Sequence, residues 1–258
     1  MKACGVITLL SDFGLQDPYV AEMKGVLLTL NPKAELVDIG HSVPPGEVPI
    51  GAFRLWRAYR HFPKGTVHLA VVDPGVGTSR KLLLAASGDY FFLAPDNGLL
   101  SPVLEETDTR CYALELRPWN RGSGATFHGR DLLAPAAAEL SLGKEPKRLG
   151  RPVGQVQSLP FWAVLRKKRV EGQIIDVDRF GNLITNIRES LLRQKGKFEI
   201  QYRNRRFLSL NKTYGNKKRS TPIALIGSCA LLEIALPRGN AQKALRGCIG
   251  QKVTVRYA

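Results

Sequence analysis

The feature that most constrains the fold is a change in hydrophobic pattern along the chain. Over residues 1–150, apolar runs typical of buried strands alternate with stretches whose apolar residues recur at helical spacing. The run "GVITLLSD" is followed by "DPYVAEMKGVLLTLNP", and "AELVDIG" is followed by "GEVPIGAFRLWRAYRHFP". Such alternation predicts an α/β domain with a mostly parallel sheet and helices packed on its faces.

A different pattern begins after a stretch rich in proline, glycine and polar residues. From residue 165 to residue 258, short segments with a period of two follow one another closely, among them "QIIDVD", "NLITNI" and "KVTVRYA". Short strands at this spacing predict a small all-β domain that resembles a barrel. We therefore expect an α/β domain at 1–150, a linker at 151–164 and a β-barrel-like domain at 165–258.

The composition excludes several classes of protein. No apolar run approaches the roughly 18 residues of a membrane span, and the first residues do not form a secretory signal, so we expect a cytoplasmic protein. The four cysteines contain no CxxC pair, which argues against a zinc knuckle and a disulfide framework. We expect them to be buried and reduced, and we expect no metal; they are Cys4, Cys111, Cys229 and Cys248.

The positive charge is concentrated in the last part of the chain. Residues 1–150 carry 16 basic and 16 acidic side chains, whereas residues 151–258 carry 22 basic and 6 acidic ones. A basic domain of this kind leaves nucleic acid open as a partner. A solvated basic surface is favoured over it, because no aromatic residues are interleaved with the charges.

Polar residues follow several predicted strands at the point where each strand ends. Asp12 follows the first strand, Asp73 follows the third, and Asp96 and Asn97 follow a later one. Ligands of open parallel sheets bind outside the carboxyl ends of the strands. A single aspartate at a strand end is usually a cap or a turn former, but several at one edge indicate a site that binds hydroxyls or handles protons.

Two further residues can join Asp73. Arg80 lies on the same loop, and His128 precedes a predicted helix in "TFHGRDLL". A lone histidine is more often structural than catalytic. An aspartate, an arginine and a histidine together can orient a water molecule and favour its deprotonated form, because a nearby cation stabilises hydroxide.

Six motifs in order carry a resemblance that spans nearly the whole chain. They are "SDFGLQDPYVAEMKG", "VVDPGVGTSR", "APDNGLL", "TFHGRDLLAPAAA", "DRFGNLITNI" and "GSCALLEIA" followed by "GNA". The chain resembles the S-adenosyl-L-methionine (SAM) hydroxide adenosyltransferases, the adenosine-forming SAM hydrolases related to fluorinase and chlorinase. The resemblance implies an SN2 attack of a water-derived hydroxide on ribose C5′ of SAM, which gives adenosine and L-methionine. It implies no metal or redox cofactor.

The resemblance also assigns the water-handling group. The family's aspartate, arginine and histidine fall on Asp73, Arg80 and His128. The halogenating relatives have a tyrosine and a threonine where this chain has Asp73 and Val76. The chain therefore resembles the hydrolases rather than the halogenases.

Substrate contacts are implied in both predicted domains. The resemblance assigns the ribose hydroxyls to Asp12. It assigns contacts with adenine to Phe180, Asn182, Asn240 and Ala241, and contacts with methionine to Asp178 and Ser228, with Glu233 as a further candidate. The chain departs from the fluorinase-like relatives at Cys229 and Ile184, where they have arginine and tryptophan. Without the resemblance, the segment 178–182 reads as a plain hairpin turn.

The family's sites lie between subunits of a cyclic homotrimer, which would explain why the motifs are divided between two domains. The resemblance therefore implies a homotrimer with SAM bound at its subunit interfaces. Two alternatives stay open from the sequence: a sensor that binds SAM or adenosine without turnover, and an RNA-binding protein that uses its basic barrel.

Overall fold

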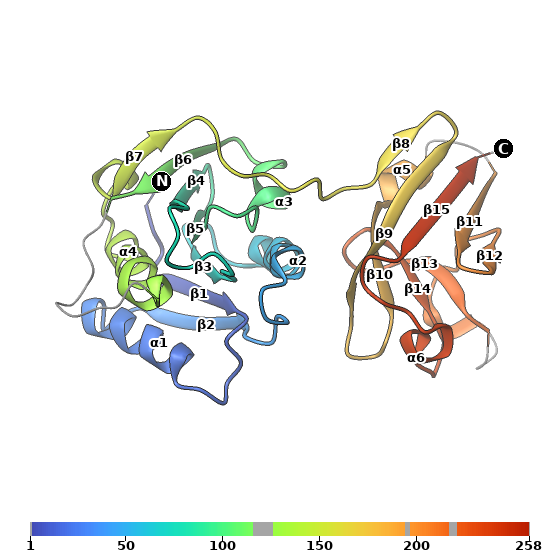
Figure 1. Cartoon of the computed structure of the whole chain (residues 1–258), viewed down its shortest axis with the longest axis horizontal. Coiled ribbons are helices and arrows are strands. Elements are labelled where there is room, and N and C mark those ends of the chain that lie inside the picture. The colour runs from blue at the N-terminus through green and yellow to red at the C-terminus, as the bar shows by residue number, and fades with distance from the viewer. Residues whose placement is uncertain (1, 116–125, 194–196, 217–220, 258) are drawn as a thin grey trace. The chain divides into compact units, whose positions relative to one another are not determined.

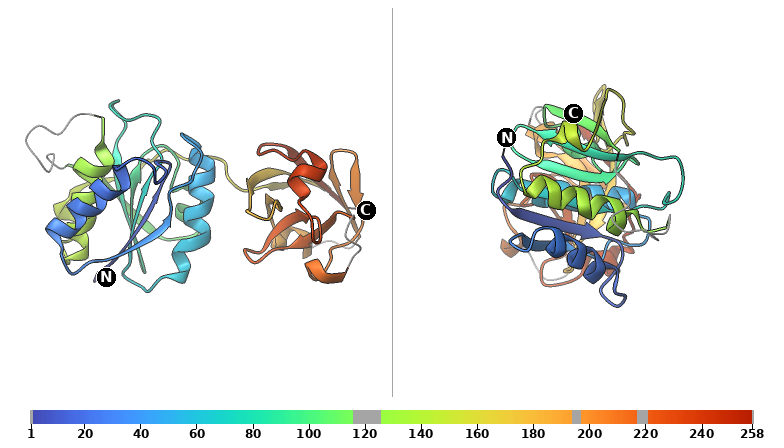
Figure 2. Two further views of the ribbon diagram at one scale, coloured as in Figure 1. Left: turned by 90° about the horizontal axis from the view of Figure 1, so that it is seen from below. Right: turned by 90° about the vertical axis from the view of Figure 1, so that its left-hand side faces the viewer.

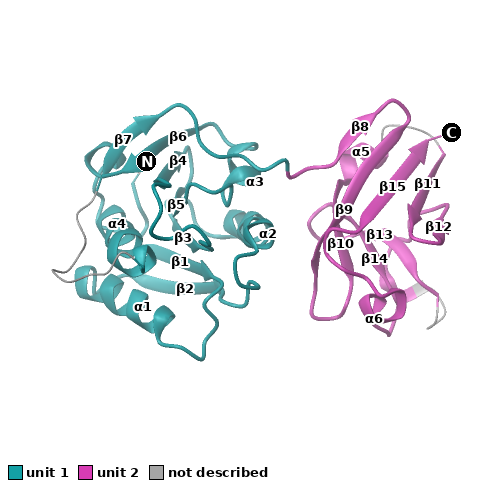
Figure 3. Ribbon diagram, in the orientation of Figure 1, with its two compact units in different colours: residues 1–160 teal, residues 161–258 magenta. Residues whose placement is uncertain are grey.

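Two units make up the chain, residues 1–160 and 161–258, as the computed structural model shows (Figure 3). The structure describes residues 2–115, 126–193, 197–216 and 221–257. The boundary between the units falls inside the segment expected to be a linker. The first residues of that segment, however, belong to the last strand of the first unit.

The first unit is built on a seven-stranded mixed sheet (Figure 1). In order across the sheet, the strands are β2 (Glu35–Gly40), β1 (Val6–Ser11), β3 (Val67–Val71), β5 (Phe91–Pro95), β4 (Leu82–Ser87), β6 (Thr109–Leu114) and β7 (Gly150–Val153). The strands from β2 to β5 are parallel, and β4, β6 and β7 pair antiparallel with their neighbours. Only a short turn separates β4 from β5, too short for the crossover that a parallel pair requires. The α/β prediction is confirmed, with an antiparallel flank added to the parallel strands.

Helices cover both faces of this sheet. In the left view of Figure 2, α1 (Tyr19–Leu30) and α4 (Ala134–Ser141) lie on one face and α2 (Val48–Ala58) on the other. The short α3 (Ser101–Leu104) packs beside α2. Helix α1 stops just before Pro32, since the residue that precedes a proline is disfavoured in a helix.

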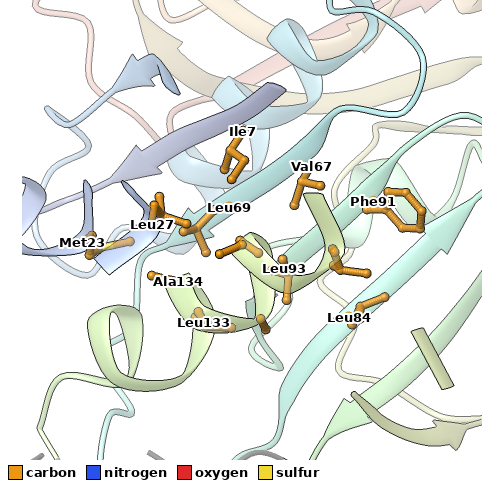
Figure 4. Packing of buried hydrophobic residues seen from close by; sticks show 14 of the residues in the cluster. Ile7, Met23, Leu27, Val67, Leu69, Leu84, Phe91, Leu93, Leu133 and Ala134 are labelled. Atoms are coloured by element: carbon orange, nitrogen blue, oxygen red, sulfur yellow. The ribbon is translucent and has the colours of Figure 1, made fainter. Parts of the chain in front are cut away.

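The core between the sheet and the layer of α1 and α4 is apolar around the strands β1, β3 and β5. Figure 4 shows Ile7, Leu69 and Leu93 of β1, β3 and β5 facing Leu27 of α1 and Leu133. Each of these five side chains is at most 1% exposed. Burial of such side chains contributes about 1.5–3 kcal/mol each, which fixes the strands whose ends carry the polar residues.

One loop of this unit stays at a single edge of the sheet. Because β4 is antiparallel to β5, it begins at the edge where the parallel strand β3 ends. The loop of residues 72–81 therefore passes the carboxyl end of β5 without leaving that edge. A π-helical turn, Gly129–Leu133, leads into α4.

The second unit is an eight-stranded antiparallel sheet that curls into a nearly closed barrel. Its order is β12 (Arg205–Phe207), β11 (Phe198–Tyr202), β15 (Lys252–Tyr257), β9 (Arg169–Val177), β10 (Leu183–Arg188), β14 (Leu231–Ala235) and β13 (Ile223–Ile226), with β8 (Val164–Arg166) paired to β9. Two short helices, α5 (Glu189–Arg193) and α6 (Ala241–Leu245), follow β10 and β14. The prediction of a barrel-like all-β domain is confirmed.

The cysteines differ from expectation in their burial. All four are free, but Cys4 and Cys248 are exposed and Cys111 and Cys229 are half-buried. The prediction that they are buried is wrong, because Cys4 and Cys248 lie in the connections that precede β1 and β15 rather than in the strands.

In the part of the chain that the structure describes, no helix has the length and apolar character needed to cross a membrane.

Candidate active site

Asp73 and Arg80 form a bidentate ion pair across the loop between β3 and β4. Arg80 Nε donates to Asp73 Oδ1 at 2.6 Å, and Arg80 Nη2 donates to Asp73 Oδ2. The two side chains are only 6% and 9% exposed, so solvent screens the pair weakly. The remaining nitrogen, Nη1, is buried without a hydrogen-bond partner among the described residues. A buried donor in that state fits a site that a bound molecule completes.

His128 joins this pair through a ring nitrogen. Arg80 Nη2 lies 3.0 Å from His128 Nδ1. A guanidinium has only donors, so Nδ1 is the acceptor and the proton of the neutral ring sits on Nε2. Burial lowers the pKa of His128, and the Arg80 charge lowers it further, against opposing effects of Asp73 and Asp131. The imidazole is therefore neutral near pH 7.

A second ion pair holds the turn that carries His128. Arg130 Nε donates to Asp131 Oδ1 at 2.6 Å, and Arg130 Nη1 donates to Glu22 Oε2 at 2.6 Å. Asp131 is 2% exposed, and Glu22 lies on α1, so the turn is fixed against that helix. The sequence analysis missed this support, although "GRD" directly follows His128.

Asp73 of this ion pair and His128 border a cavity of about 230 Å³. Asp73 and His128 supply its polar wall, while Phe13, Tyr19 and Phe127 line it with aromatic rings. The three rings are in mutual contact, with centroids 5.3–5.6 Å apart. The sequence analysis missed these rings too, although each lies in a motif that it quoted. The cavity thus combines a carboxylate and an imidazole with aromatic walls, as ligand sites do.

Asp12 lies beside the loop that carries Asp73. It follows β1 directly, and Gly46 N donates to its Oδ2 at 2.8 Å. Gly46 in turn lies against Pro74: a Cβ added to the glycine would be 3.7 Å from the Pro74 Cβ. The structure therefore brings Asp12 and Asp73 to one edge of the sheet, as the sequence predicts.

Asp96 and Asn97 have structural partners at the same edge. Asn97 Nδ2 donates to the carbonyl oxygen of Val72 at 2.8 Å, and Asp96 Oδ1 accepts from Gln157 N at 2.7 Å. Asn97 therefore fixes the end of the strand segment that leads into Asp73.

In the second unit, the predicted adenine residues gather around the turn between β9 and β10. Asp178 Oδ1 accepts from the backbone of Phe180 and Asn182 at 2.9 and 2.8 Å, and its Oδ2 accepts from Asn182 Nδ2 at 2.8 Å. Asn240 packs against Gly181 of this turn and caps α6, whose first residue is Ala241, by accepting from Lys243 N. Asp178 thus serves the turn itself, as the plain hairpin reading expects. Phe180 is left 75% exposed at its tip.

Ser228 and Glu233 lie apart from that turn. Strands β10 and β14 are antiparallel, so the turn before β14, with Ser228, is at the opposite end of this pair from the turn before β10. Ser228 is exposed, and its Oγ lies 3.9 Å from Cys229 Sγ. Glu233 is 5% exposed, accepts from Tyr214 Oη at 2.8 Å and lies opposite Ile184, which is buried. The buried Glu233 supports the fold at this point, and its ligand contact stays a prediction.

Metal ligands are not grouped in the described ranges: no cluster of three or more His, Cys, Asp or Glu side chains there could hold a metal ion.

Comparison with known proteins relates both units to one family. The model of the SAM hydroxide adenosyltransferase N-terminal domain matches residues 7–150, and that of the C-terminal domain matches residues 172–254. An (R)-S-adenosyl-L-methionine hydrolase of Thermus thermophilus is 41% identical, covering 93% of this chain and 94% of its own. A fluorinase of Actinoplanes is 29% identical over 74% of each chain. A crystal structure of a conserved protein from Thermotoga maritima superposes with a TM-score of 0.89 at 34% identity, covering 97% of this chain and 99% of that one.

Proposed function

The chain belongs to the SAM hydroxide adenosyltransferase family, and from this we propose that it hydrolyses SAM to adenosine and L-methionine. The observation that supports this most directly is the Asp73, Arg80 and His128 group, hydrogen-bonded together beside an aromatic cavity. The sensor and the RNA-binding protein that the sequence left open are not favoured by these relatives.

In the proposed reaction, Asp73 orients the attacking water. Its carboxylate is fixed by two bonds from Arg80, so a water that donates to it has a defined position. The guanidinium stabilises negative charge on the water oxygen as its O–H bond breaks. Neutral His128 adds an Nε2–H donor without adding a positive charge beside the substrate sulfonium.

The bond changes follow from the substrate. The water oxygen forms a bond to ribose C5′ while the C5′–S bond breaks, and the electron pair of that bond leaves with sulfur to give neutral methionine. As the C–O bond forms, the attacking oxygen becomes strongly acidic, so a carboxylate is basic enough to take its proton. The leaving group is already activated by its positive charge, and no metal or redox cofactor is needed in this proposal.

Asp12 is proposed to bind the ribose. A carboxylate can accept a hydrogen bond from each hydroxyl of a vicinal diol. Asp12 follows β1 beside the Asp73 loop, which is consistent with a ribose held next to the attacked carbon.

We propose that the second unit of a neighbouring subunit completes the site in a cyclic homotrimer. The adenine residues lie in the second unit and the water-handling residues in the first, so a complete site requires both. The exposed Phe180 ring then covers adenine, and Asn182 and the segment Asn240–Ala241 meet its edge. Asp178 and Ser228 remain proposed contacts of methionine.

Four free cysteines agree with a cytoplasmic location, where thiols stay reduced.

The configuration at sulfur is the finer question of substrate. The Thermus thermophilus relative is named for the (R) form, and we propose the same preference here. The test is to incubate the purified protein separately with (R)-SAM and (S)-SAM and to quantify adenosine and methionine. Equal amounts of both products, formed faster from the (R) form, are expected; binding of SAM without either product would instead support the sensor.

A further inference from the structure

Behind Asp12, four side chains form a chain of contacts from the core to the surface. Ser11 Oγ lies 2.7 Å from His41 Nδ1, and His41 Nε2 lies 3.1 Å from Asp38 Oδ1. Asp38 Oδ2 accepts from Lys24 Nζ at 2.6 Å. Ser11 and His41 are 1% and 4% exposed. This chain links the end of β1 to β2 and, through Lys24, to α1.

His41 also holds the residues that follow Asp12. Its carbonyl oxygen accepts from Gly14 N at 2.8 Å, and Ser11 Oγ accepts from Phe13 N at 3.4 Å. The segment that continues from His41 reaches Gly46, whose N–H is bonded to the Asp12 carboxylate. His41 therefore restrains the backbone on both sides of Asp12.

A serine, a histidine and an aspartate also make up hydrolytic triads, but Ser11, His41 and Asp38 cannot act as one. The serine of a triad must reach its substrate, and Ser11 is almost completely buried. Burial raises the pKa of Asp38, but Lys24 and His41 outweigh it and leave the pKa below its ordinary value. Asp38 thus presents an ionised carboxylate 3.1 Å from Nε2 of the His41 ring.

We infer that His41 is a positioning residue that fixes the Asp12 carboxylate for the ribose diol, which rests on the proposed role of Asp12. Two hydroxyls on adjacent carbons can both donate to a carboxylate only over a narrow range of orientations. The bond of the His41 ring to Ser11 Oγ limits the rotation of the segment that carries Asp12, and the backbone bond from Gly14 N to the His41 carbonyl oxygen is common to every His41 variant.

The experiment compares binding of adenosine and 2′-deoxyadenosine by calorimetry, which needs no turnover. Wild type should prefer adenosine by on the order of tenfold, because a hydrogen bond to a charged group is lost with the 2′-hydroxyl. Asp12→Ala should abolish the preference. His41→Ala should reduce it to below about threefold, and His41→Asn, whose amide can reach Ser11, should restore most of it. The double variant Asp12→Ala/His41→Ala should show no further loss.

His68→Ala is the matched control. Its ring also bonds a β1 hydroxyl through Nδ1, Thr8 Oγ1 at 2.8 Å, and it is fully buried, but it lies away from Asp12. We expect it to lower the melting temperature while keeping the preference for adenosine. An unchanged preference in His41→Ala, or an equal loss in His68→Ala, would overturn the inference. A wild type that binds both nucleosides equally but hydrolyses SAM would overturn it and leave the proposed reaction intact; one that prefers adenosine but releases no products would do the reverse.

Discussion

Arg80 donates through Nη2 to His128 Nδ1 across 3.0 Å, which places the proton of the neutral imidazole on Nε2. Protonation of Nδ1 breaks this bond and, in the proposed reaction, adds a positive charge near the substrate sulfonium. Because burial and then Arg80 lower the pKa of His128 below 6.5, the neutral form persists through neutral pH. We expect kcat/KM for SAM to be constant there and to fall only as the pH drops through that lowered pKa.

The matched variant for this pH profile is His128→Asn. Its amide oxygen can accept from Arg80 but does not titrate, so the acid limb assigned to His128 should disappear at a reduced overall rate. A limb that persists in His128→Asn, or one centred above pH 6.5 in wild type, would show that another group controls it.

Asp73→Asn should lower kcat by at least about 10²-fold, because the amide can no longer take the proton of the attacking water. Asp89→Asn serves as the control, since Asp89 forms an exposed ion pair with Lys64 away from the cavity. Circular dichroism and adenosine release should be measured for both. Near-normal turnover by a folded Asp73→Asn protein contradicts the role given to this carboxylate.

The subunit arrangement can be tested with two inactive proteins. Asp73→Ala alters the first unit and Asn182→Ala the second, so each parent trimer should lack activity. After subunit exchange at equal amounts, about a quarter of the interfaces in a cyclic trimer would combine an intact Asp73 with an intact Asn182. We expect activity to rise toward that fraction. Mixtures that stay as inactive as their parents would place both residues in one subunit's site.

Water should be preferred over halide as the nucleophile. An anion about 4 Å from the Asp73 carboxylate is repelled by about 4 kcal/mol at an intermediate dielectric, although Arg80 offsets part of this. Val76, which lines the cavity, offers no hydroxyl to bind a halide. Turnover in high chloride or fluoride should therefore still give adenosine. A 5′-halo-5′-deoxyadenosine as the main product would falsify the hydrolase assignment.

Gly181 gives a prediction about the adenine end of the site. Its φ is +83°, and a Cβ there would lie 2.3 Å from the Asn240 side chain. Gly143 has a φ of +93° and open space around its Cβ position. Both alanine variants carry a backbone penalty of about 1–2 kcal/mol, but only Gly181→Ala should also weaken adenosine binding, because it displaces Asn240. Equal affinities in the two variants would contradict a role for Asn240 at adenine.

The strand ends were the part of the site best predicted from sequence. Apolar runs that stop at Asp12 and Asp73 identify the edge of a sheet, because buried strands need unbroken apolar sequence. The pairing of Arg80 with Asp73 was also within reach, since seven residues allow a loop to fold back. The hydrogen bond from Arg80 to His128 joins residues 48 positions apart, and only the assembled fold brings them together.

Other features depend on packing that a single sequence does not encode locally. The antiparallel direction of β4 follows from the short turn before β5, whereas the alternation of strands and helices over residues 1–150 predicted a mostly parallel sheet. The ring contacts of Phe13, Tyr19 and Phe127 join two distant motifs. The segment 178–182 has the residues of a hairpin turn and also holds the exposed Phe180. The local sequence pattern therefore identifies the turn but does not show that it binds a ligand.

The reversed direction of β4 has a consequence for how this enzyme could change its chemistry. Both ends of the 72–81 loop return to one edge, so the carboxylate and the guanidinium of the proposed nucleophile site are encoded within ten consecutive residues. Neither residue contributes to the apolar core shown in Figure 4. Exchange of this single loop can therefore alter which nucleophile is selected, while the nucleoside contacts and the sheet stay unchanged.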